Sequence, residues 1–136
     1  MKYRIDYQET HDIDWFFRYK GKLYHAASNG GIIPDVIDSS RNRTIQEMLE
    51  EIEYRFDVEL SENVWNYHSQ EEDLDSFRDY ASKGFISLDR TINENFEDSG
   101  RLQYHIVAYP RYGGMIENRD LLQLLPDLSD YKIDIK

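Results

Sequence analysis

The chain of 136 residues carries 27 acidic against 16 basic residues, has a net charge of −11 and contains no cysteine. We expect a single α+β domain over residues 1–136 that is large enough to fold without a disulfide or a structural metal. The absence of cysteine excludes thiolate nucleophiles, thiolate zinc sites and iron–sulfur clusters.

No stretch of the sequence has the pattern of a membrane span or a secretory signal. The longest run without a charged residue, 23–34, has 12 residues, whereas a transmembrane helix needs about 20 apolar ones. Charged residues follow Met1 directly, without the apolar segment of a signal peptide. We therefore expect a cytoplasmic protein that does not bind membranes.

The N-terminal part of the chain has the pattern of β-structure. Residues 2–8 alternate between apolar and polar side chains, which predicts a half-buried strand. Residues 14–19 and 22–28 are rich in β-forming residues and flank Gly21, which predicts a hairpin. The glycines and proline of residues 29–42 predict a loop, with one short extended piece at 36–37.

A first amphipathic helix is predicted after this loop. Thr44 and Glu47 have the spacing of a capping box, in which each side chain caps the other's backbone N–H group. The apolar residues that follow share one face of a helix: Ile45, Met48, Leu49, Ile52 and Phe56.

A second helix is predicted further along the chain. Ser69 and Glu72 form another capping box, and Gly84 is the expected C-terminal stop. Residues 57–68, between the two helices, have no clear period. Three residues of this segment are expected to return the chain to the core: Val64, Trp65 and Tyr67.

The C-terminal part again has the pattern of strands. Residues 85–88 and 102–109 predict two strands of a hairpin around the polar residues 93–100, and apolar residues on both sides of the second strand favour a central position. Asn118 is the expected cap of a short leucine-rich turn, and residues 131–135 alternate like a last strand.

This order of elements predicts the fold class. It lacks the strict alternation of strand and helix that is typical of a doubly wound sheet. We expect an α+β fold, with a mostly antiparallel sheet of five or six strands and two amphipathic helices packed on one face.

Two histidines are candidate catalytic residues of a small hydrolase or phosphoesterase-like enzyme. His25 and His105 lie in predicted strands, where they can face each other on one surface of the sheet. Phosphoesterases with two strand-borne histidines also need a hydroxyl two residues after each one. Here these positions hold Ala27 and Val107, so the enzyme is an alternative and not our first hypothesis.

The sequence offers little for a metal or a cofactor. His11, Asp12 and Asp14 form a short cluster that needs further ligands to hold a cation, and no recognised metal or nucleotide motif accompanies it. We expect neither a metal site nor a cofactor.

The strongest functional signal is an acidic middle segment. Residues 47–79 contain twelve acidic and two basic residues, whereas the rest of the chain is nearly neutral. Such a field repels phosphate, so we expect no direct nucleic-acid binding. Several of these acidic residues also lie where the dipole of the predicted helix favours cations, at a cost in stability.

We therefore expect a protein-binding or inhibitory module, of the immunity or anti-defence type, that docks an acidic helical face on a basic protein partner. A self-associating structural subunit, a possible homodimer, is a further alternative. The candidate partner-binding residues are Glu47, Glu50, Glu51, Glu53, Glu71, Glu72, Asp73 and Asp75.

Overall fold

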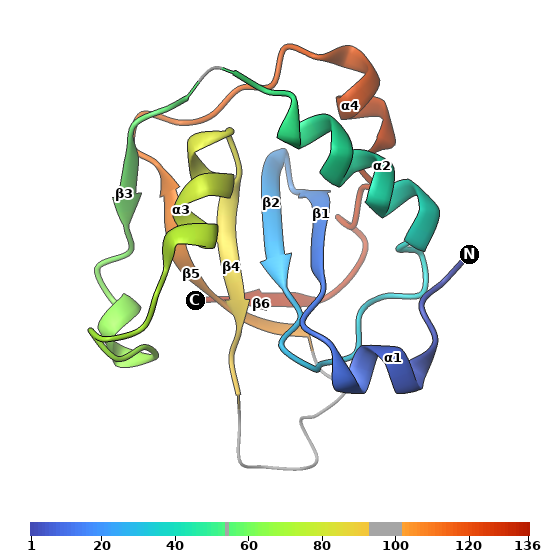
Figure 1. Ribbon diagram of the computed structural model, residues 1–136, viewed down its shortest axis with the longest axis horizontal. Helices are drawn as coiled ribbons and strands as arrows, with labels where there is room; N and C mark the ends of the chain where they lie inside the picture. The colour runs from blue at the N-terminus through green and yellow to red at the C-terminus, as the bar shows by residue number, and fades with distance from the viewer. Residues whose placement is uncertain (54, 93–101) are drawn as a thin grey trace.

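The computed structural model describes residues 1–53, 55–92 and 102–136 (Figure 1). In chain order its elements are α1 (Ile5–Thr10), β1 (Asp14–Tyr19), β2 (Lys22–Ala27), α2 (Ser39–Glu50), β3 (Val58–Leu60), the 3₁₀ turn η1 (Val64–Asn66), α3 (Asp75–Ser82), β4 (Ile86–Arg90), β5 (Leu102–Pro110), α4 (Arg119–Leu124) and β6 (Ile133–Ile135). The α+β class predicted from the sequence is confirmed.

The six strands form one mixed sheet, so the expectation of a mostly antiparallel sheet is wrong. The strand order is β1-β2-β4-β5-β3, and β6 pairs with β5. Three pairings are antiparallel, β1 with β2, β4 with β5 and β3 with β5, but β2–β4 and β5–β6 are parallel. The parallel pairs arise because long connections that contain helices separate these strands in the chain, which permits a crossover.

Strand β5 is an interior strand of the sheet and pairs with three others. It pairs with β4 along one edge, while β3 pairs with its C-terminal end and β6 with its N-terminal end. The central position predicted from its apolar residues on both sides is therefore confirmed.

Helices α2 and α3 lie on the same face of the sheet (Figure 1). Phe16 of β1 is fully buried between them, in one cluster with Ile45 and Leu49 of α2 and in ring contact with Tyr80 of α3. We call this side of the molecule the helix face. The two amphipathic helices expected on one face are thus present.

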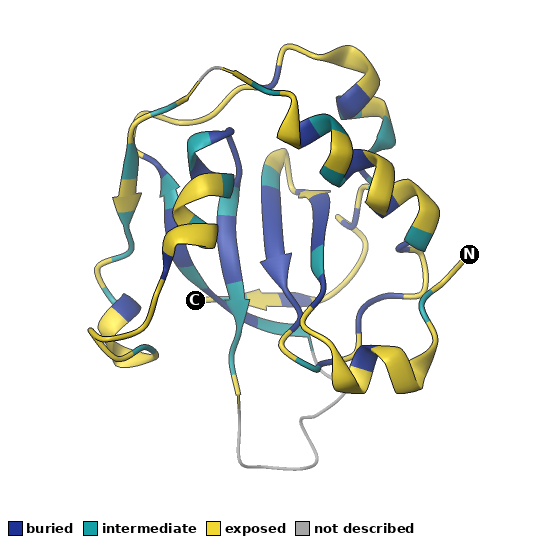
Figure 2. Ribbon diagram, viewed as in Figure 1, coloured by how far each residue is buried: buried dark blue, intermediate teal, exposed yellow. Residues whose placement is uncertain are grey.

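The opposite face of the sheet is covered by irregular segments. Trp15, Phe17 and Tyr104 project from it and pack with Ile33 and Leu128, which lie outside the helices and strands. Figure 2 shows the strands buried between this layer and the helices, whose outer sides are exposed.

The strand predicted over residues 2–8 is wrong, because residues 5–8 belong to helix α1 and Lys2 forms only an isolated bridge with Asp38. The aromatic rings of this segment stack at helical spacing, with ring centroids 6.0 Å apart for Tyr3 and Tyr7 and 3.8 Å apart for Tyr7 and His11. The buried amide of Gln8 accepts a hydrogen bond from the backbone N–H of Ile33 and donates one to the carbonyl of Tyr3. These contacts stabilise the helix, although the period-2 pattern of the segment also fits a strand.

Helix α2 begins earlier than its predicted capping box implies, and it ends earlier than its predicted apolar face implies. Asp38 is the N-cap, and its carboxylate accepts a hydrogen bond of 2.8 Å from the backbone N–H of Arg41. Thr44 lies inside the helix, where its hydroxyl donates to the carbonyl of Ser40. The helix ends at Glu50, so Ile52 and Phe56 lie beyond it.

The second predicted helix is shorter than expected. The Ser69–Glu72 box forms locally, since Ser69 Oγ accepts from the N–H of Glu71 and Glu72 Oε1 from the N–H of Ser69, but regular helix begins only at Asp75. Gly84 has a φ of +111° and ends α3 as predicted.

The segment before α3 returns to the core at one residue instead of three. Val64 is fully buried, whereas Trp65 and Tyr67 are exposed. The extended piece predicted at residues 36–37 is a turn, in which Ile37 is buried and Val36 exposed.

The C-terminal predictions are confirmed in outline. β4 and β5 pair as a hairpin, although its predicted turn at 93–100 lies outside the described residues. Asn118 caps α4 by accepting a hydrogen bond from the N–H of Leu121. Over the described parts of the chain, no helix is long and apolar enough to cross a membrane.

Candidate functional site

The helix face of the sheet carries a row of polar side chains across its central strands. The register places His25 of β2 beside Ser87 of β4, and Asp89 of β4 beside His105 of β5. Because side chains alternate along a strand, these four lie on the same face. The structure therefore brings the two candidate histidines to one surface, with β4 between them.

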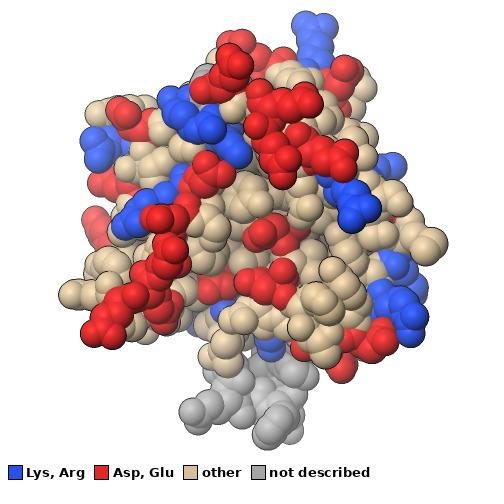
Figure 3. Space-filling model, in the orientation of Figure 1, with Lys and Arg blue, Asp and Glu red and all other residues tan. Residues whose placement is uncertain are grey.

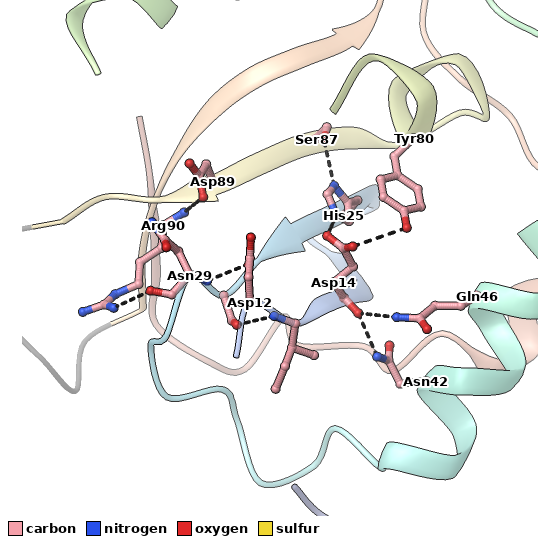
Figure 4. A network of polar contacts seen from close by, with 12 residues as sticks. Asp12, Asp14, His25, Asn29, Asn42, Gln46, Tyr80, Ser87, Asp89 and Arg90 are labelled. Carbon is pink, nitrogen blue, oxygen red and sulfur yellow. Dashed lines mark hydrogen bonds and ion pairs between the residues drawn. The ribbon is translucent and has the colours of Figure 1, made fainter. Parts of the chain in front are cut away.

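His25 holds the centre of a buried network (Figure 4). Its Nδ1 lies 2.6 Å from Ser87 Oγ, and its Nε2 lies 2.8 Å from Asp14 Oδ1. The ring of Tyr80 stacks on the imidazole at 4.1 Å, and its hydroxyl donates weakly to the other oxygen of Asp14, at 3.5 Å. The carbonyl of Asp14 accepts hydrogen bonds from the side chains of Asn42 and Gln46.

Serine, histidine and aspartate in contact are the components of a hydrolase triad, but this arrangement has no exposed nucleophile. Ser87 and His25 are both 0% exposed, in strands covered by the helices. A serine nucleophile must reach its substrate, and its base must be able to release the proton it takes up. The contacts of His25 and Ser87 instead satisfy polar groups inside the core.

The carboxylate of Asp14 connects this network to a pocket of about 470 Å³ between α1, α2 and the start of β1. Its lining is mostly polar and mixes acidic, basic and hydroxyl groups. The lining residues are Tyr3, Tyr7, Asp12, Ile13, Asp14, Ser39, Ser40, Arg43 and Gln46.

A second group of polar side chains surrounds His105. Its Nε2 lies 2.7 Å from Nε2 of His68, which follows η1 in the chain. Asp89 Oδ2 lies 3.6 Å from the same atom of His68. The Nδ1 atom of each ring has a separate hydrogen-bond partner. Glu72 Oε2 lies 2.6 Å from Nδ1 of His68, and Thr91 Oγ1 lies 3.0 Å from Nδ1 of His105.

Burial dominates the electrostatics of this group. It lowers the pKa of His105 to about 4, with a further contribution from the nearby His68. Burial also raises the pKa of Asp89 to about 6; Asp12 and Glu72 add to the rise, while His68 and the backbone N–H of Arg90 oppose it. Among the described residues, His68, Asp89 and His105 form the one cluster of histidine and acidic ligand atoms close enough to share a metal ion.

The short cluster at residues 11–14 does not converge on one point. Nδ1 of His11 lies 3.0 Å from the carbonyl oxygen of Tyr7, and the His11 ring stacks on the Tyr7 ring. Asp12 accepts a hydrogen bond from the N–H of Asn29, and Asp14 contacts His25. Each of the three side chains thus has a separate partner.

The acidic residues lie on the surface in two stretches. One comprises the second half of α2 and the residues after it, and the other the segment that leads into α3. All eight candidate partner-binding residues are exposed: Glu47, Glu50, Glu51, Glu53, Glu71, Glu72, Asp73 and Asp75. Figure 3 shows acidic side chains gathered over both regions of the helix face.

The sequence reasoning missed His68 and Asp89. His68 lies in the segment without a clear period, and Asp89 lies one residue past the predicted end of its strand, which the structure extends to Arg90. The one local signal was Glu72, four residues after His68. The contact with His105 spans 37 positions and depends on the fold.

The chain was also compared with models of protein families, with curated proteins and with solved structures, and none of these comparisons found a match.

Proposed function

We propose that this protein is a binding module that docks its helix face on a basic protein partner. The observation that carries this proposal is the convergence of carboxylates from β1, α2 and α3 near Tyr80. Burial raises the pKa of the Tyr80 hydroxyl, and the negative charges of Asp14, Asp79 and Glu50 raise it further. A field built from three elements favours a cationic group and opposes a phosphate.

The end of α2 supports a role for this charge beyond solubility. The last turn contains no basic residue, although the helix dipole favours cations there; Glu47 and Glu50 lie in it instead, and Glu51 is the C-cap. Each such placement costs a few tenths of a kcal/mol at an exposed site. Selection for stability alone would disfavour this arrangement.

An inhibitor of a nucleic-acid-handling enzyme is the form of this function that we favour. Such an enzyme carries a basic groove for phosphate, and an acidic protein surface can occupy that groove in competition with the nucleic acid. The proposal concerns the chemistry of the partner and leaves its sequence open.

Charge reversal on α2 tests the proposal. The full chain and its E47K/E50K/E51K variant are used to capture proteins from a lysate of the native host at low salt, and captured partners are identified by mass spectrometry. We expect basic proteins on the wild type and their loss from the variant. For a purified partner, the association rate should fall as salt rises, because exposed charges steer the encounter.

A control variant separates the surface from net charge. E117K/D130K/D134K reverses three exposed acidic residues outside the two acidic stretches. This variant changes the net charge by the same amount but leaves both acidic stretches intact. It should therefore still bind the partner. Equal binding by both triple variants would mean that the acidic residues only keep the protein soluble.

The two alternatives remain predictions. An enzyme that uses His25 and His105 has to act through side chains that are 0% and 3% exposed, so no observation favours it over docking. Replacement of either histidine by Gln should change any activity by only a few-fold, whereas loss of a catalytic acid or base lowers a rate about 10²–10⁴-fold. A self-associating subunit predicts a dimer, which light scattering can detect.

A further inference from the structure

His68, Asp89 and His105, which we call the histidine cluster, each offer one ligand atom, and these three atoms lie within 4.8 Å of one another. They come from three segments, the turn after η1, strand β4 and strand β5. The side chains of His68 and Asp89 are 7% and 14% exposed, and His105 is 3% exposed. The cluster thus lies just below the surface, where the ring of Tyr67 stacks on His105 at 4.1 Å.

The outer partners of the two histidines fix which nitrogen faces the cluster. A carboxylate accepts hydrogen bonds, so Glu72 Oε2, at 2.6 Å, requires a proton on Nδ1 of His68. In the neutral ring this leaves Nε2 of His68 with a free lone pair that points at the cluster. Thr91 Oγ1 can donate to Nδ1 of His105 or accept from it, so its 3.0 Å contact permits either neutral form of that ring.

Hydrogen bonding inside the cluster accounts for only part of this arrangement. Nε2 of His105 can donate to Nε2 of His68 across the 2.7 Å between them. Asp89 Oδ2, however, lies 3.6 Å from the same nitrogen, beyond hydrogen-bond distance, so no hydrogen bond between these two atoms accounts for its position. Two imidazole nitrogens and a carboxylate oxygen thus converge with one proton between the nitrogens, and a cation that replaces this proton can bind all three atoms.

We propose that the histidine cluster binds one divalent transition-metal ion of the zinc type through His68 Nε2, His105 Nε2 and a carboxylate oxygen of Asp89. Zinc bonds of about 2.0–2.1 Å in a tetrahedral site place neighbouring ligand atoms roughly 3.3 Å apart. The distance of 3.6 Å between Asp89 and His68 is close to this value. The two imidazole nitrogens, now at 2.7 Å, need to separate by about 0.6 Å.

The donor types indicate the class of metal. Two imidazole nitrogens and one carboxylate oxygen suit zinc and its neighbours in the first transition series, whereas Ca²⁺ and Mg²⁺ prefer sets of oxygen ligands. Glu72 stands behind His68 in the manner of the carboxylates that orient histidine ligands to zinc. The ion would join the segment that carries Glu71, Glu72 and Asp73 to the sheet, but the inference does not depend on the proposed docking function.

Titration of the metal-free full chain with Zn²⁺ and with Co²⁺ tests the inference. Calorimetry should give one ion per chain, Co²⁺ should produce the strong visible absorption of a tetrahedral site, and Zn²⁺ should raise the unfolding temperature. A tenfold excess of Mg²⁺ should not displace the zinc.

Four variants assign the ligands. His68→Gln and the nearly isosteric Asp89→Asn should each weaken zinc binding at least about 100-fold, and Glu72→Gln about 10–100-fold, as for loss of a supporting carboxylate. His11→Gln is the control, because His11 is exposed and lies outside the cluster, and it should bind like the wild type. Circular dichroism verifies the fold of each variant, and Asp89→Asn preserves the test if His68→Gln does not fold.

Two results would overturn the inference. Absence of a saturable one-to-one zinc complex with the wild type would leave the cluster as a hydrogen-bonded histidine pair only. Zinc binding of unchanged strength in His68→Gln and Asp89→Asn would locate the ion elsewhere on this acidic protein.

Discussion

At the scale of single residues, burial decides what each histidine can do. His11 and His25 both lie beside acidic residues in the sequence or in space. His11 is exposed and stacks on Tyr7, whereas His25 is fully buried and has a partner on each ring nitrogen. The same side chain is thus a surface group at one position and a part of the core at the other.

Replacement of His25 by Gln should lower the free energy of unfolding by about 1–3 kcal/mol. The amide cannot reach both partners, so either Ser87 or the buried side of Asp14 loses its hydrogen bond. Urea unfolding at neutral pH measures the loss. His11→Gln is the matched control and should stay within about 0.5 kcal/mol of the wild type; equal losses in the two variants would contradict this account of His25.

At the scale of elements, helix α2 shows how a local motif can be misplaced. The sequence offers two possible N-caps for this helix. One is Asp38, which accepts a hydrogen bond from the N–H of Arg41, and the other is Thr44, with Glu47 three residues later. The buried contacts of Asn42 with Tyr3 and with the carbonyl of Asp14 favour the earlier start, because they require Asn42 to lie within the helix. A tertiary contact therefore decides between two acceptable caps.

The position of the cap can be tested with three variants. Asp38→Ala should lower the free energy of unfolding by about 0.5–2 kcal/mol, because it leaves the first turn of α2 without its acceptor. Asp38→Asn retains a capping oxygen and should restore most of this loss. Thr44→Ala, inside the helix, should change stability by less than about 0.5 kcal/mol. Chemical denaturation measures the free energy of unfolding of the three variants. A larger loss of stability for Thr44→Ala than for Asp38→Ala would show that Thr44 is the cap.

At the scale of the whole molecule, one sheet holds cores on both of its faces. Trp15 is buried on one face and Phe16, its neighbour in β1, on the other. Since one strand contributes to both layers, neither layer can lose its packing without exposing the other. We therefore expect the chain to unfold as a single unit.

Two spectroscopic probes test this cooperativity. Trp15 is 0% exposed and Trp65 is 44% exposed, and the chain has no other tryptophan. In the Trp65→Phe variant, fluorescence reports on the buried Trp15 alone, while circular dichroism reports on all elements. The two unfolding curves should coincide. A separate transition in either signal would show that the two layers unfold independently.

The elements whose signals are local could be predicted from the sequence alone. The turn at Lys20-Gly21, the alternation of β5 and the glycine after α3 each act over a few residues, so a pattern of a few residues was sufficient to predict them. The charge of residues 47–79 also follows directly from the sequence and predicts that the surface will be acidic.

Which of these elements meet depends on contacts between residues far apart in the chain. The helical state of α1, the parallel pairing of β2 with β4 and the approach of His68 to His105 and Asp89 all depend on partners far away in the chain. A strand pattern does not specify the direction of its neighbour, and a lone histidine in a loop does not indicate what it will face. The acidic surface could therefore be predicted from composition, whereas the histidine cluster exists only because the fold brings β4, β5 and the turn after η1 together.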